Sequence, residues 1–373
     1  MITCFVHMRA RVHVNSVVRP PAPKPKLRNG MRILIIGGTG LISAPMTQML
    51  LAQGDDVTHF NRGRLDLYPA PPGVTTVHGD RTDYAAFERQ VHDLGLFDCV
   101  IDMVGYLPED AHSAVRAFRG RAGQFLFCST VDVYRKPAAS YPVTESEGYG
   151  GLNTYSRNKV AIEQTLFAAH AAGDFPLTVI RPAYTYGEGR GPLHSFGGRT
   201  SYVDRIRKGK PIVVHGDGSS FWTACHKDDV ARAFVAATRN PQTIGKAYHT
   251  PGEEWLTWDM YHRAVAAALG APAPQLVHIP TDLLALAAPK HAAICVENFQ
   301  FSNIFDTSAA HADLDFRYTV TWREGAQRMV AWLDAHGAVE PWDSDPYEDR
   351  LITAWRRSGE RLVADLAASG GVE

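Results

Sequence analysis

The chain has 373 residues, enough for one large α/β domain and a smaller lobe. Its 45% hydrophobic and 21% charged residues are ordinary values for a globular protein. The formal net charge of −1 gives no overall electrostatic reason to expect nucleic acid or an anionic membrane surface as a partner. The absence of an apolar run of about 18 residues argues against a membrane-spanning helix.

The five cysteines are scattered along the chain and do not stand at metal-ligand spacing. This pattern predicts neither a disulfide framework nor a zinc site. The 16 histidines contain no His-x-x-x-His pair, so we expect no metal centre. Such cysteine usage fits a reducing, cytoplasmic setting.

Residues 1–30 are basic and contain no acidic residue, with four prolines between Pro20 and Pro25. The segment lacks the long apolar stretch of a secretory signal and is poor in serine. We therefore interpret it as a disordered extension, or as the result of a start codon placed too early. Met31 is then the expected beginning of the folded domain.

The first predicted strand, residues 33–36, runs into a glycine-rich turn and then directly into an amphipathic helix. Gly37 lets the chain turn tightly, and Gly40 lets the backbone approach a pyrophosphate near the first N–H groups of the helix. Ser43 stands where a third glycine is usual. The turn predicts a dinucleotide site that also includes Thr39, Leu41 and Ile42.

A second strand, residues 56–60, is followed by Asn61 and Arg62. In nucleotide-binding folds, the residue about 20 positions beyond the glycine turn contacts the adenosine ribose. An acidic residue there favours NAD, whereas an arginine accommodates the 2′-phosphate of NADP. The sequence therefore predicts NAD or NADP as the cofactor and favours NADP.

A third strand, residues 74–78, precedes Asp80, which we expect to bind adenine, and Arg81, which we include among the cofactor-binding residues. Asp83 is the predicted cap of the next helix. The fourth strand, residues 97–103, is almost continuously apolar, as expected for a strand buried on both faces. Val104 and Gly105 follow it, where the cofactor should pass.

A helix over residues 110–119 leads to a fifth strand, residues 124–129. Strands that alternate with helices in this way predict an α/β fold with a doubly wound parallel sheet of the Rossmann type. Ligands bind beyond the carboxyl ends of the strands in such sheets. The residues at those ends are therefore the main candidates for chemistry.

Thr130 stands at the end of the fifth strand, and the next helix carries Tyr155 and Lys159. The two helical residues are four apart, so they share one face. A neighbouring ammonium favours phenolate, so we expect Lys159 to lower the pKa of Tyr155 towards the working range of an acid/base. Thr130 would orient the substrate oxygen. These three residues form the predicted catalytic group.

The sequence resembles the extended (atypical) short-chain dehydrogenase/reductase superfamily, in its nucleotide-sugar epimerase and dehydratase branch. The resemblance covers about residues 31–335. It implies a nicotinamide cofactor, with Tyr155 as acid/base, Lys159 on the nicotinamide ribose and Pro182 near the nicotinamide amide. The segments that carry it are GGTGLIS at 37–43, HGDRTD at 78–83, FCSTVDVY at 127–134, TYSRNK at 154–159, RPAYTYGEG at 181–189 and HKDDVARAF at 226–234.

Departures from the family pattern at Ser43, at 104–106 and at Arg135 indicate an outlying subgroup. The glycine turn, FNRGR at 60–64 and the region 305–308 are similar to epimerase-like proteins that include chloroplast stem-loop RNA-binding members. The presence of the predicted catalytic group argues for an active enzyme.

The cofactor domain is predicted over 31–191, with later return segments near 226–250, at 234–238 and near Tyr248. Residues 184–191 are expected to form a glycine-bearing loop over the site. A smaller C-terminal substrate-binding lobe is predicted over 192–225 and 250–320, followed by C-terminal helices over 321–373. Candidates for binding a substrate diphosphate or base are Arg199, Arg205, His215 and Trp222, and Tyr106 is a further candidate for contact with the substrate.

A final helix over 351–366 carries apolar residues at helical spacing, so it either packs back onto the core or forms a contact in a homodimer. We expect a small-molecule substrate, a sugar or nucleotide-sugar, and neither a membrane nor a nucleic acid as a partner.

The leading hypothesis is an NAD(P)-dependent epimerase that oxidises a secondary alcohol transiently and returns the hydride to the ketone. Alternatives are an NADP-dependent reductase or dehydrogenase, a dehydratase in which Asp132 and Glu145 act as extra acid/base groups, and a non-catalytic nucleotide- or RNA-binding scaffold.

Overall fold

The computed structural model describes residues 30–64 and 67–369. The extension predicted over 1–30 therefore lies outside the described residues, apart from Gly30. The main sheet has seven parallel strands in the order β11-β6-β5-β4-β1-β2-β3. Their bounds are β1 Arg32–Ile36, β2 Asp56–Asn61, β3 Thr75–His78, β4 Cys99–Asp102, β5 Phe125–Cys128, β6 Leu177–Pro182 and β11 Lys246–Thr250.

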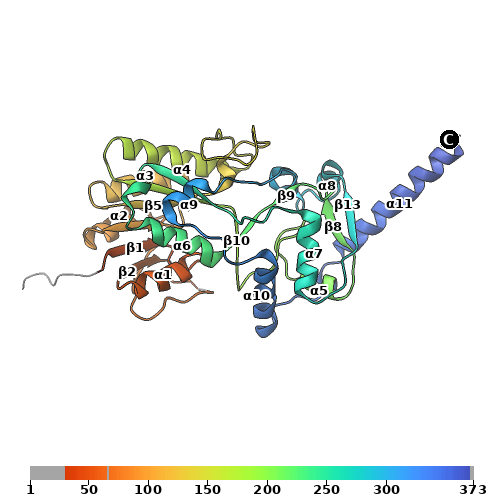
Figure 1. Cartoon of the computed structure of the whole chain (residues 1–373), viewed down its shortest axis with the longest axis horizontal. Coiled ribbons are helices and arrows are strands. Elements are labelled where there is room, and N and C mark those ends of the chain that lie inside the picture. Colours follow the sequence, from red (N-terminus) through yellow and green to blue (C-terminus); the bar gives the residue numbers. More distant parts are fainter. Residues whose placement is uncertain (1–29, 65–66, 370–373) are drawn as a thin grey trace, which may run out of the picture.

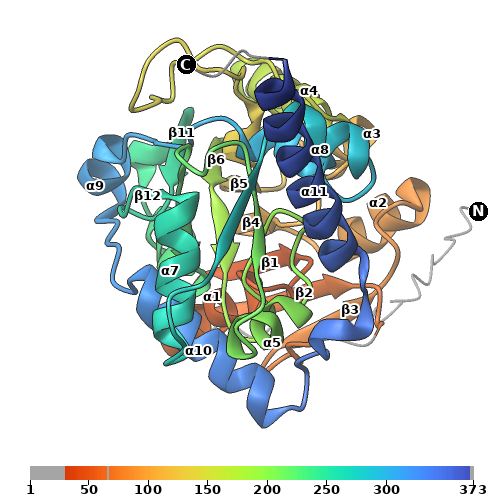
Figure 2. The same cartoon turned by 90° about the vertical axis from the view of Figure 1, so that its right-hand side faces the viewer.

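Helices cover both faces of this sheet because alternate apolar residues of each central strand point to opposite sides. In β1, Ile33 and Ile35 belong to one buried cluster, whereas Leu34 and Ile36 belong to another. Figure 2 shows the sheet and its flanking helices from the side. The first face is covered by α1 Ser43–Ala52, α6 Lys227–Ala237 and α9 Ser308–Leu314, and the second by α2 Tyr84–Asp93, α3 Pro108–Phe118 and α4 Thr154–Ala171.

The strand order reverses its direction of growth between β1 and β4. From β1 the chain adds β2 and β3 on one side, and then β4, β5, β6 and β11 on the other. This reversal opens a crevice beyond the carboxyl ends of β1 and β4, which is where doubly wound sheets bind their ligands. The predicted fold class is therefore confirmed, and the strand order places the glycine turn at the expected crevice.

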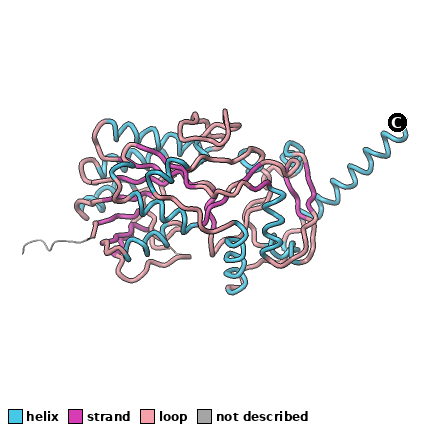
Figure 3. The backbone as a smooth tube through the Cα atoms, in the orientation of Figure 1, coloured by secondary structure: helices cyan, strands magenta, loops and turns pink. Residues whose placement is uncertain are grey.

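The smaller lobe lies beside the carboxyl ends of the sheet (Figure 1), and its short strands pair in twos (Figure 3). The pairs are β7 Tyr184–Tyr186 with β10 Ala224–His226, β8 Ile212–His215 with β13 Leu276–Ile279, and β9 Phe221–Trp222 with β12 Leu256–Thr257. The α-helices are α5 Ser201–Arg207, α7 Trp258–Ala268, α8 Thr281–Ala287, α10 Trp322–Ala335 and α11 Tyr347–Ala368. Short helical turns span Val131–Val133, Pro241–Thr243, Cys295–Phe299 and Trp342–Ser344.

Aromatic packing holds the lobe together. The rings of Tyr261 and Trp322 stack with their centroids 4.2 Å apart, and those of Trp258 and Phe299 lie 4.5 Å apart. All four side chains are almost completely buried. Because aromatic pairs contribute beyond the area they bury, these rings give the lobe a core separate from the two cores of the sheet.

Two predicted segments adopt a different structure. Residues 234–238 are not a return to the sheet, because α6 continues through Ala237 and packs Val230 and Phe234 into the buried face that it shares with α1. The chain returns to the sheet only at β11. The loop predicted over 184–191 begins as β7, because the backbone pairs with β10 from Tyr184 to Tyr186.

The predicted C-terminal helix is present as α11, but only its first turns pack against the lobe. Ile352 is buried in the lobe core, whereas Leu362 and Val363 are 61% and 67% exposed. The rest of α11 extends away from the body of the molecule (Figure 1). Among the described residues, no helix combines the length and apolar character that crossing a membrane requires.

Candidate active site

The glycine turn after β1 is shaped by two close contacts. Gly37 has a φ of +86°, and a Cβ there would lie 2.4 Å from a methyl group of Val104. The Ser43 hydroxyl donates a hydrogen bond of 2.7 Å to the Gly37 carbonyl, which explains how serine replaces the third glycine. The residue before α1, Ile42, provides no side-chain cap. The Ala44 N–H already donates to the Gly40 carbonyl at 3.0 Å, and Pro45 has no N–H group, so the first turn of α1 offers an anion fewer free donors than the glycine-turn pattern predicts.

A cavity of about 550 Å³, here called the glycine-turn cavity, lies beside this turn. It borders the carboxyl ends of β1, β2, β3 and β4. The structure thus collects most of the predicted cofactor-binding residues around one space, together with Arg64, which the sequence reasoning missed. Its lining includes Gly37, Thr39, Gly40, Asn61, Arg62, Arg64, Asp80, Arg81, Val104 and Tyr106.

The residues at the outer end of this cavity differ in whether their side chains already form hydrogen bonds within the protein. The Asn61 side-chain oxygen accepts a hydrogen bond of 2.9 Å from the Gly38 N–H, so it holds the turn in place. Arg62 and Arg64 are exposed at the rim. One Asp80 oxygen accepts hydrogen bonds from Thr82, whose backbone N–H chiefly lowers the pKa of the aspartate. Adenine binding by Asp80 stays a prediction.

Arg81 lines the glycine-turn cavity, and its guanidinium is at the same time held by carboxylates of the protein. Its guanidinium is buried between two carboxylates, 2.7 Å from Asp102 and 3.2 Å from Asp110. A buried guanidinium requires such partners, and these two hold the end of β3 against β4 and α3. Unlike Arg81, the predicted cofactor residues Leu41 and Gly105 are not among the residues that line the cavities beside the turn.

Gly105 is needed for packing. A Cβ at this position would lie 2.8 Å from the Phe127 ring, so glycine lets the chain after β4 pass close to β5.

A second cavity, of about 300 Å³ and here called the tyrosine cavity, is lined by Thr130 and Tyr155 of the predicted catalytic group, whereas Lys159 is not among its lining residues. Thr130 caps a short helical turn at the end of β5 and accepts a hydrogen bond of 3.2 Å from the Asp132 N–H. Tyr155 lies in the first turn of α4, which begins where Asn153 caps the Ser156 N–H. The Thr130 hydroxyl lies close enough to Tyr155 to act on its pKa, and both residues line this cavity. Local caps at two helix starts therefore place the hydroxyl groups side by side.

Lys159 lies one turn after Tyr155 and is buried. Its ammonium donates a hydrogen bond of 2.7 Å to the Cys128 carbonyl and lies 5.8 Å from the centre of the Tyr155 ring. Burial lowers the pKa of Lys159.

The expected lowering of the Tyr155 pKa is wrong for the structure as it stands. Burial is the main cause that raises this pKa, and neighbouring Cys128 and Asp132 raise it further, while the Thr130 hydrogen bond lowers it. The Lys159 ammonium, 5.8 Å from the centre of the Tyr155 ring, does not reverse this shift. Tyr155 therefore holds its proton firmly at neutral pH.

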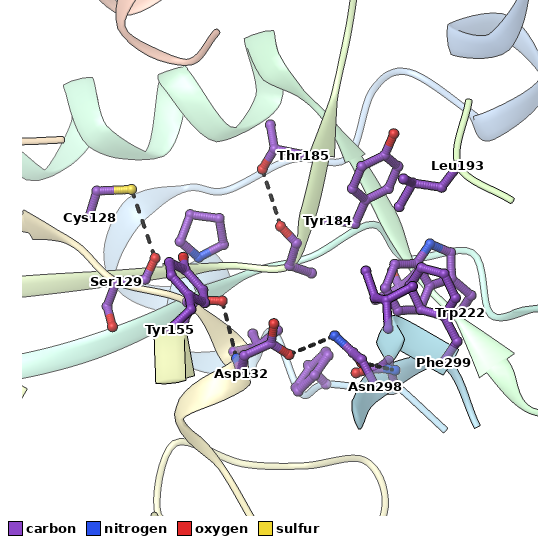
Figure 4. Close-up of a pocket in the computed structure, with 18 of the residues that line it drawn as sticks. Cys128, Ser129, Asp132, Tyr155, Tyr184, Thr185, Leu193, Trp222, Asn298 and Phe299 are labelled. Carbon is purple, nitrogen blue, oxygen red and sulfur yellow. Dashed lines mark hydrogen bonds between the residues drawn. The ribbon is translucent and has the colours of Figure 1, made fainter. Parts of the chain in front are cut away.

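Figure 4 shows the tyrosine cavity between the end of the sheet and the lobe. Cys128, Ser129 and Tyr155 lie on the sheet side, while Trp222 and Phe299 close the lobe side. The predicted cofactor residues Ile42 and Pro182 also line this space. The sequence reasoning missed Asn298, which lies in the five-residue helical turn Cys295–Phe299, and Asn303, which follows it outside any helix or strand; neither segment is long enough to carry a periodic signal. The remaining lining includes Val131, Asp132, Tyr184, Thr185, Leu193, Ile294 and Phe305.

The candidate substrate residues are dispersed. Trp222 lines the tyrosine cavity, and Tyr106 lines the glycine-turn cavity. Arg199 is wrong as a ligand of this site because it is exposed elsewhere and pairs with Glu340 and Asp345. His215 is also wrong. It is 1% exposed in the lobe core, where its ring contacts the Ser195 hydroxyl and the Phe299 carbonyl.

Two further candidates lie outside the tyrosine cavity: Arg205, proposed for substrate binding, and Glu145, proposed as an extra acid/base group. Arg205 is buried against Glu348 and Asp349, outside the tyrosine cavity. Glu145 contacts His249 and does not line the cavity, whereas Asp132 does.

The family model for the NAD dependent epimerase/dehydratase family matches residues 33–250. The chain belongs to this family. The match spans the glycine turn, Thr130, Tyr155 and Lys159. Members of the NAD dependent epimerase/dehydratase family are NAD(P)-dependent sugar-modifying epimerases, dehydratases and reductases, so this chain is an enzyme of that oxidoreductase type and NAD(P) is its cofactor. The resemblance drawn from the sequence motifs is thereby confirmed.

Two relatives match over most of their length. The chain is 29% identical over 287 residues to chloroplast stem-loop binding protein of 41 kDa b of Arabidopsis thaliana, covering 72% of this chain and 73% of the relative. It is 28% identical over 278 residues to 2'-dehydrokanamycin reductase of Streptomyces kanamyceticus, covering 74% and 77%.

The fold is also found in solved epimerase structures. UDP-glucose 4-epimerase from Bifidobacterium longum, in complex with NAD+ and UDP, has a TM-score of 0.64 at 20% identity. The similarity covers 83% of this chain and 100% of that one. At this level of identity, the similarity concerns the fold.

Proposed function

We propose that this member of the family is an NADP-dependent reductase that converts the carbonyl group of a hydroxylated, sugar-like compound to a secondary alcohol. The observation that carries the proposal is the Thr130–Tyr155 pair in a cavity whose lining also includes Ile42 from the end of the glycine turn. Substrate carbonyl and cofactor can therefore meet beside a proton donor.

Proton transfer falls to Tyr155 in this mechanism. NADPH held at the glycine turn would supply the hydride for the carbonyl carbon, and the Tyr155 hydroxyl would donate a proton to the carbonyl oxygen. The Thr130 hydroxyl orients that oxygen. The raised pKa of Tyr155 suits this direction because the residue starts as a protonated acid. The hydrogen bond that the Lys159 ammonium donates to the Cys128 carbonyl fixes the position of this buried charge next to the site.

The preference for NADP rests on the rim of the glycine-turn cavity. Arg62 and Arg64 are both exposed there, close enough to Asp80 to lower its pKa. The position at the end of β2 that carries an acidic residue in NAD-specific folds is occupied here by Asn61, whose oxygen already holds Gly38. The two arginines that follow this uncharged residue suit a 2′-phosphate.

A reductase is preferred to the epimerase hypothesis for two reasons. The proposed NADP preference fits an enzyme that exchanges its cofactor, and the relative matched over 77% of its length is named a reductase. Epimerisation remains the second candidate, since the family includes epimerases and the same Tyr155 would return the proton. Stoichiometric oxidation of NADPH during turnover supports reduction, whereas turnover without net oxidation supports epimerisation.

The test of the catalytic group replaces Tyr155 with phenylalanine. We expect Tyr155→Phe to lower kcat by at least about a hundredfold, the scale of general acid catalysis. Tyr141→Phe is the matched control, because Tyr141 is also 42% exposed but lies outside both cavities. Unchanged NADPH oxidation in Tyr155→Phe would exclude this mechanism.

The cofactor preference is tested by Arg62→Ala combined with Arg64→Ala. Loss of both charges should raise KM for NADPH by roughly tenfold or more while changing KM for NADH little. Arg89→Ala, at an exposed arginine of α2, serves as the control. An equal rise in both KM values would contradict 2′-phosphate recognition.

A further inference from the structure

The tyrosine cavity contains no arginine or lysine among the described residues that line it. Tyr184, Trp222 and Phe299 make much of its wall aromatic. Its volume of about 300 Å³ is at the lower end of the range for small-molecule sites, which runs from about 300 to about 1,000 Å³. Proteins usually hold phosphate groups with arginine or lysine. No lining residue of this cavity therefore supplies a cation to a nucleoside diphosphate, although the charge of the exposed Arg190 reaches Tyr184 and opposes the rise of its pKa.

Three arginines of the lobe face carboxylates of the C-terminal segment. Arg205 is the clearest case, since it is 2% exposed and lies 3.2 Å from Glu348 and 2.9 Å from Asp349. Arg199 and Arg207 are paired in the same way with acidic residues between 334 and 345. Because these ion pairs neutralise the arginines, the lobe does not offer their charges to a ligand in the cavity.

One charged pair stands at the cavity wall, and its charges cancel. An Asp132 oxygen accepts hydrogen bonds of 2.7 Å from the Lys136 ammonium and 2.9 Å from the Asn298 amide. Lys136 also donates to the Asn298 carbonyl oxygen at 2.5 Å, and only 9% of its side chain is exposed. Figure 4 shows Asp132 and Asn298 facing each other across this part of the cavity. The wall is thus polar but has no net charge.

Two further polar groups of the lining are buried without a hydrogen-bond partner among the described residues. They are the indole N–H of Trp222 and the hydroxyl of Ser129. Their side chains belong to residues that are 5% and 4% exposed. A buried polar group without a partner costs free energy, so such groups at a cavity mark positions where a ligand completes the hydrogen bonding.

We infer that the substrate is an uncharged, hydroxylated carbonyl compound without a phosphate or nucleotide, and that Asp132, Trp222 and Ser129 recognise its hydroxyl groups. The inference rests on the proposed reductase function, which it deepens by naming the substrate class. The neutral pair at Asp132 and Lys136 accepts and orients hydroxyls without attracting an anion.

The first experiment compares a ketosugar methyl glycoside with the same ketosugar linked to dTDP, at saturating NADPH. We expect kcat/KM to be higher for the methyl glycoside by at least roughly tenfold, because the diphosphate would enter a cavity without a compensating cation. A higher kcat/KM for the dTDP-linked sugar would overturn the inference while leaving the reductase proposal intact.

The second experiment measures binding and needs no turnover. UDP is titrated calorimetrically into enzyme saturated with NADP+, so that the nucleotide cannot enter the cofactor site. We expect no binding to the wild type at millimolar UDP. Binding in the micromolar range that Trp222→Ala abolishes would overturn the inference. Failure of the reductase proposal is judged separately, from the Tyr155→Phe variant.

Asp132→Asn provides the sharpest variant because it leaves Lys136 with an uncompensated charge. We expect KM for the methyl glycoside to rise by roughly tenfold, with a weaker change in kcat, and UDP binding to become measurable. The double variant Asp132→Asn with Lys136→Met should abolish the gain in UDP binding. A merely structural role of Asp132 would not produce opposite effects on the two ligands, and UDP binding unchanged in Asp132→Asn would contradict the charge argument.

Discussion

Gly37 and Gly40 stand three residues apart in the turn after β1, but a side chain would have different effects at the two positions. Gly37 has a positive φ, and a Cβ would collide with Val104. Gly40 has no positive φ, and its nearest obstacle is the Ser43 hydroxyl at 3.4 Å. The first glycine is required by the fold, whereas the second keeps an open surface towards the cofactor.

Alanine at these two positions should therefore separate stability from binding. Gly37→Ala is expected to lower the free energy of unfolding by roughly 1–3 kcal/mol from backbone strain, with an added cost for the contact with Val104. Gly40→Ala should change this free energy by less than about 0.5 kcal/mol but weaken cofactor binding. Chemical denaturation and NADPH titration measure the two effects. Equal loss of stability in both variants would contradict the assignment.

At the scale of one element, α11 changes character along its length. Ile352 packs with the aromatic lobe core, and Trp355 is still partly buried against it. Leu362, Val363 and Leu366 are exposed, and this end of the helix extends into solvent. The homodimer suggested by the apolar spacing of this helix stays a prediction.

Truncation of single side chains in α11 tests whether its packed start and its exposed end contribute differently to stability. Ile352→Ala should destabilise the protein by about 2–4 kcal/mol, because it leaves a cavity in the lobe core. Leu362→Ala is the matched control in the same helix and should cost less than about 0.5 kcal/mol. Urea denaturation gives both values at one protein concentration. A similar cost at Leu362 would show that the exposed end is covered in solution.

For the whole molecule, buried histidines dominate the expected response to acid. Burial lowers the pKa of His194 to about 3 and the pKa values of His215 and His249 to about 4. In the unfolded chain these groups titrate near about 6.5. Glu348 has the opposite effect, because burial outweighs Arg205 and raises its pKa to about 7.

These shifts predict that stability rises with pH between about 4 and about 6.5. In this range the unfolded histidines bind protons that the folded histidines do not, so raising the pH removes an advantage of the unfolded state. Glu348 reduces the slope because its folded form keeps a proton that the unfolded form has lost. Glu348→Gln should therefore steepen the dependence. Urea denaturation at several pH values measures it, and stability that falls as pH rises through this range would contradict the prediction.

The amino-acid sequence by itself determined the Rossmann half of this protein. The glycine turn, the alternating strands and helices, the cap at Asp83 and the four-residue spacing of Tyr155 and Lys159 are all local patterns. Local patterns follow from backbone sterics and from the burial of one helix stripe or two strand faces, so they can be predicted without knowing the tertiary structure. The choice of an epimerase could not be derived from those local patterns, and we propose a reductase in its place.

Only the tertiary structure decided how the remaining polar residues are used. Arg81 pairs with Asp102 and Asp110, Arg199 meets Glu340, and Asp132 meets Asn298, which lies 166 residues later in the chain. A charged side chain has the same identity whether it binds a ligand or neutralises a distant carboxylate. Its role depends on which partner the fold places within a few ångströms, and no local periodicity encodes that distance.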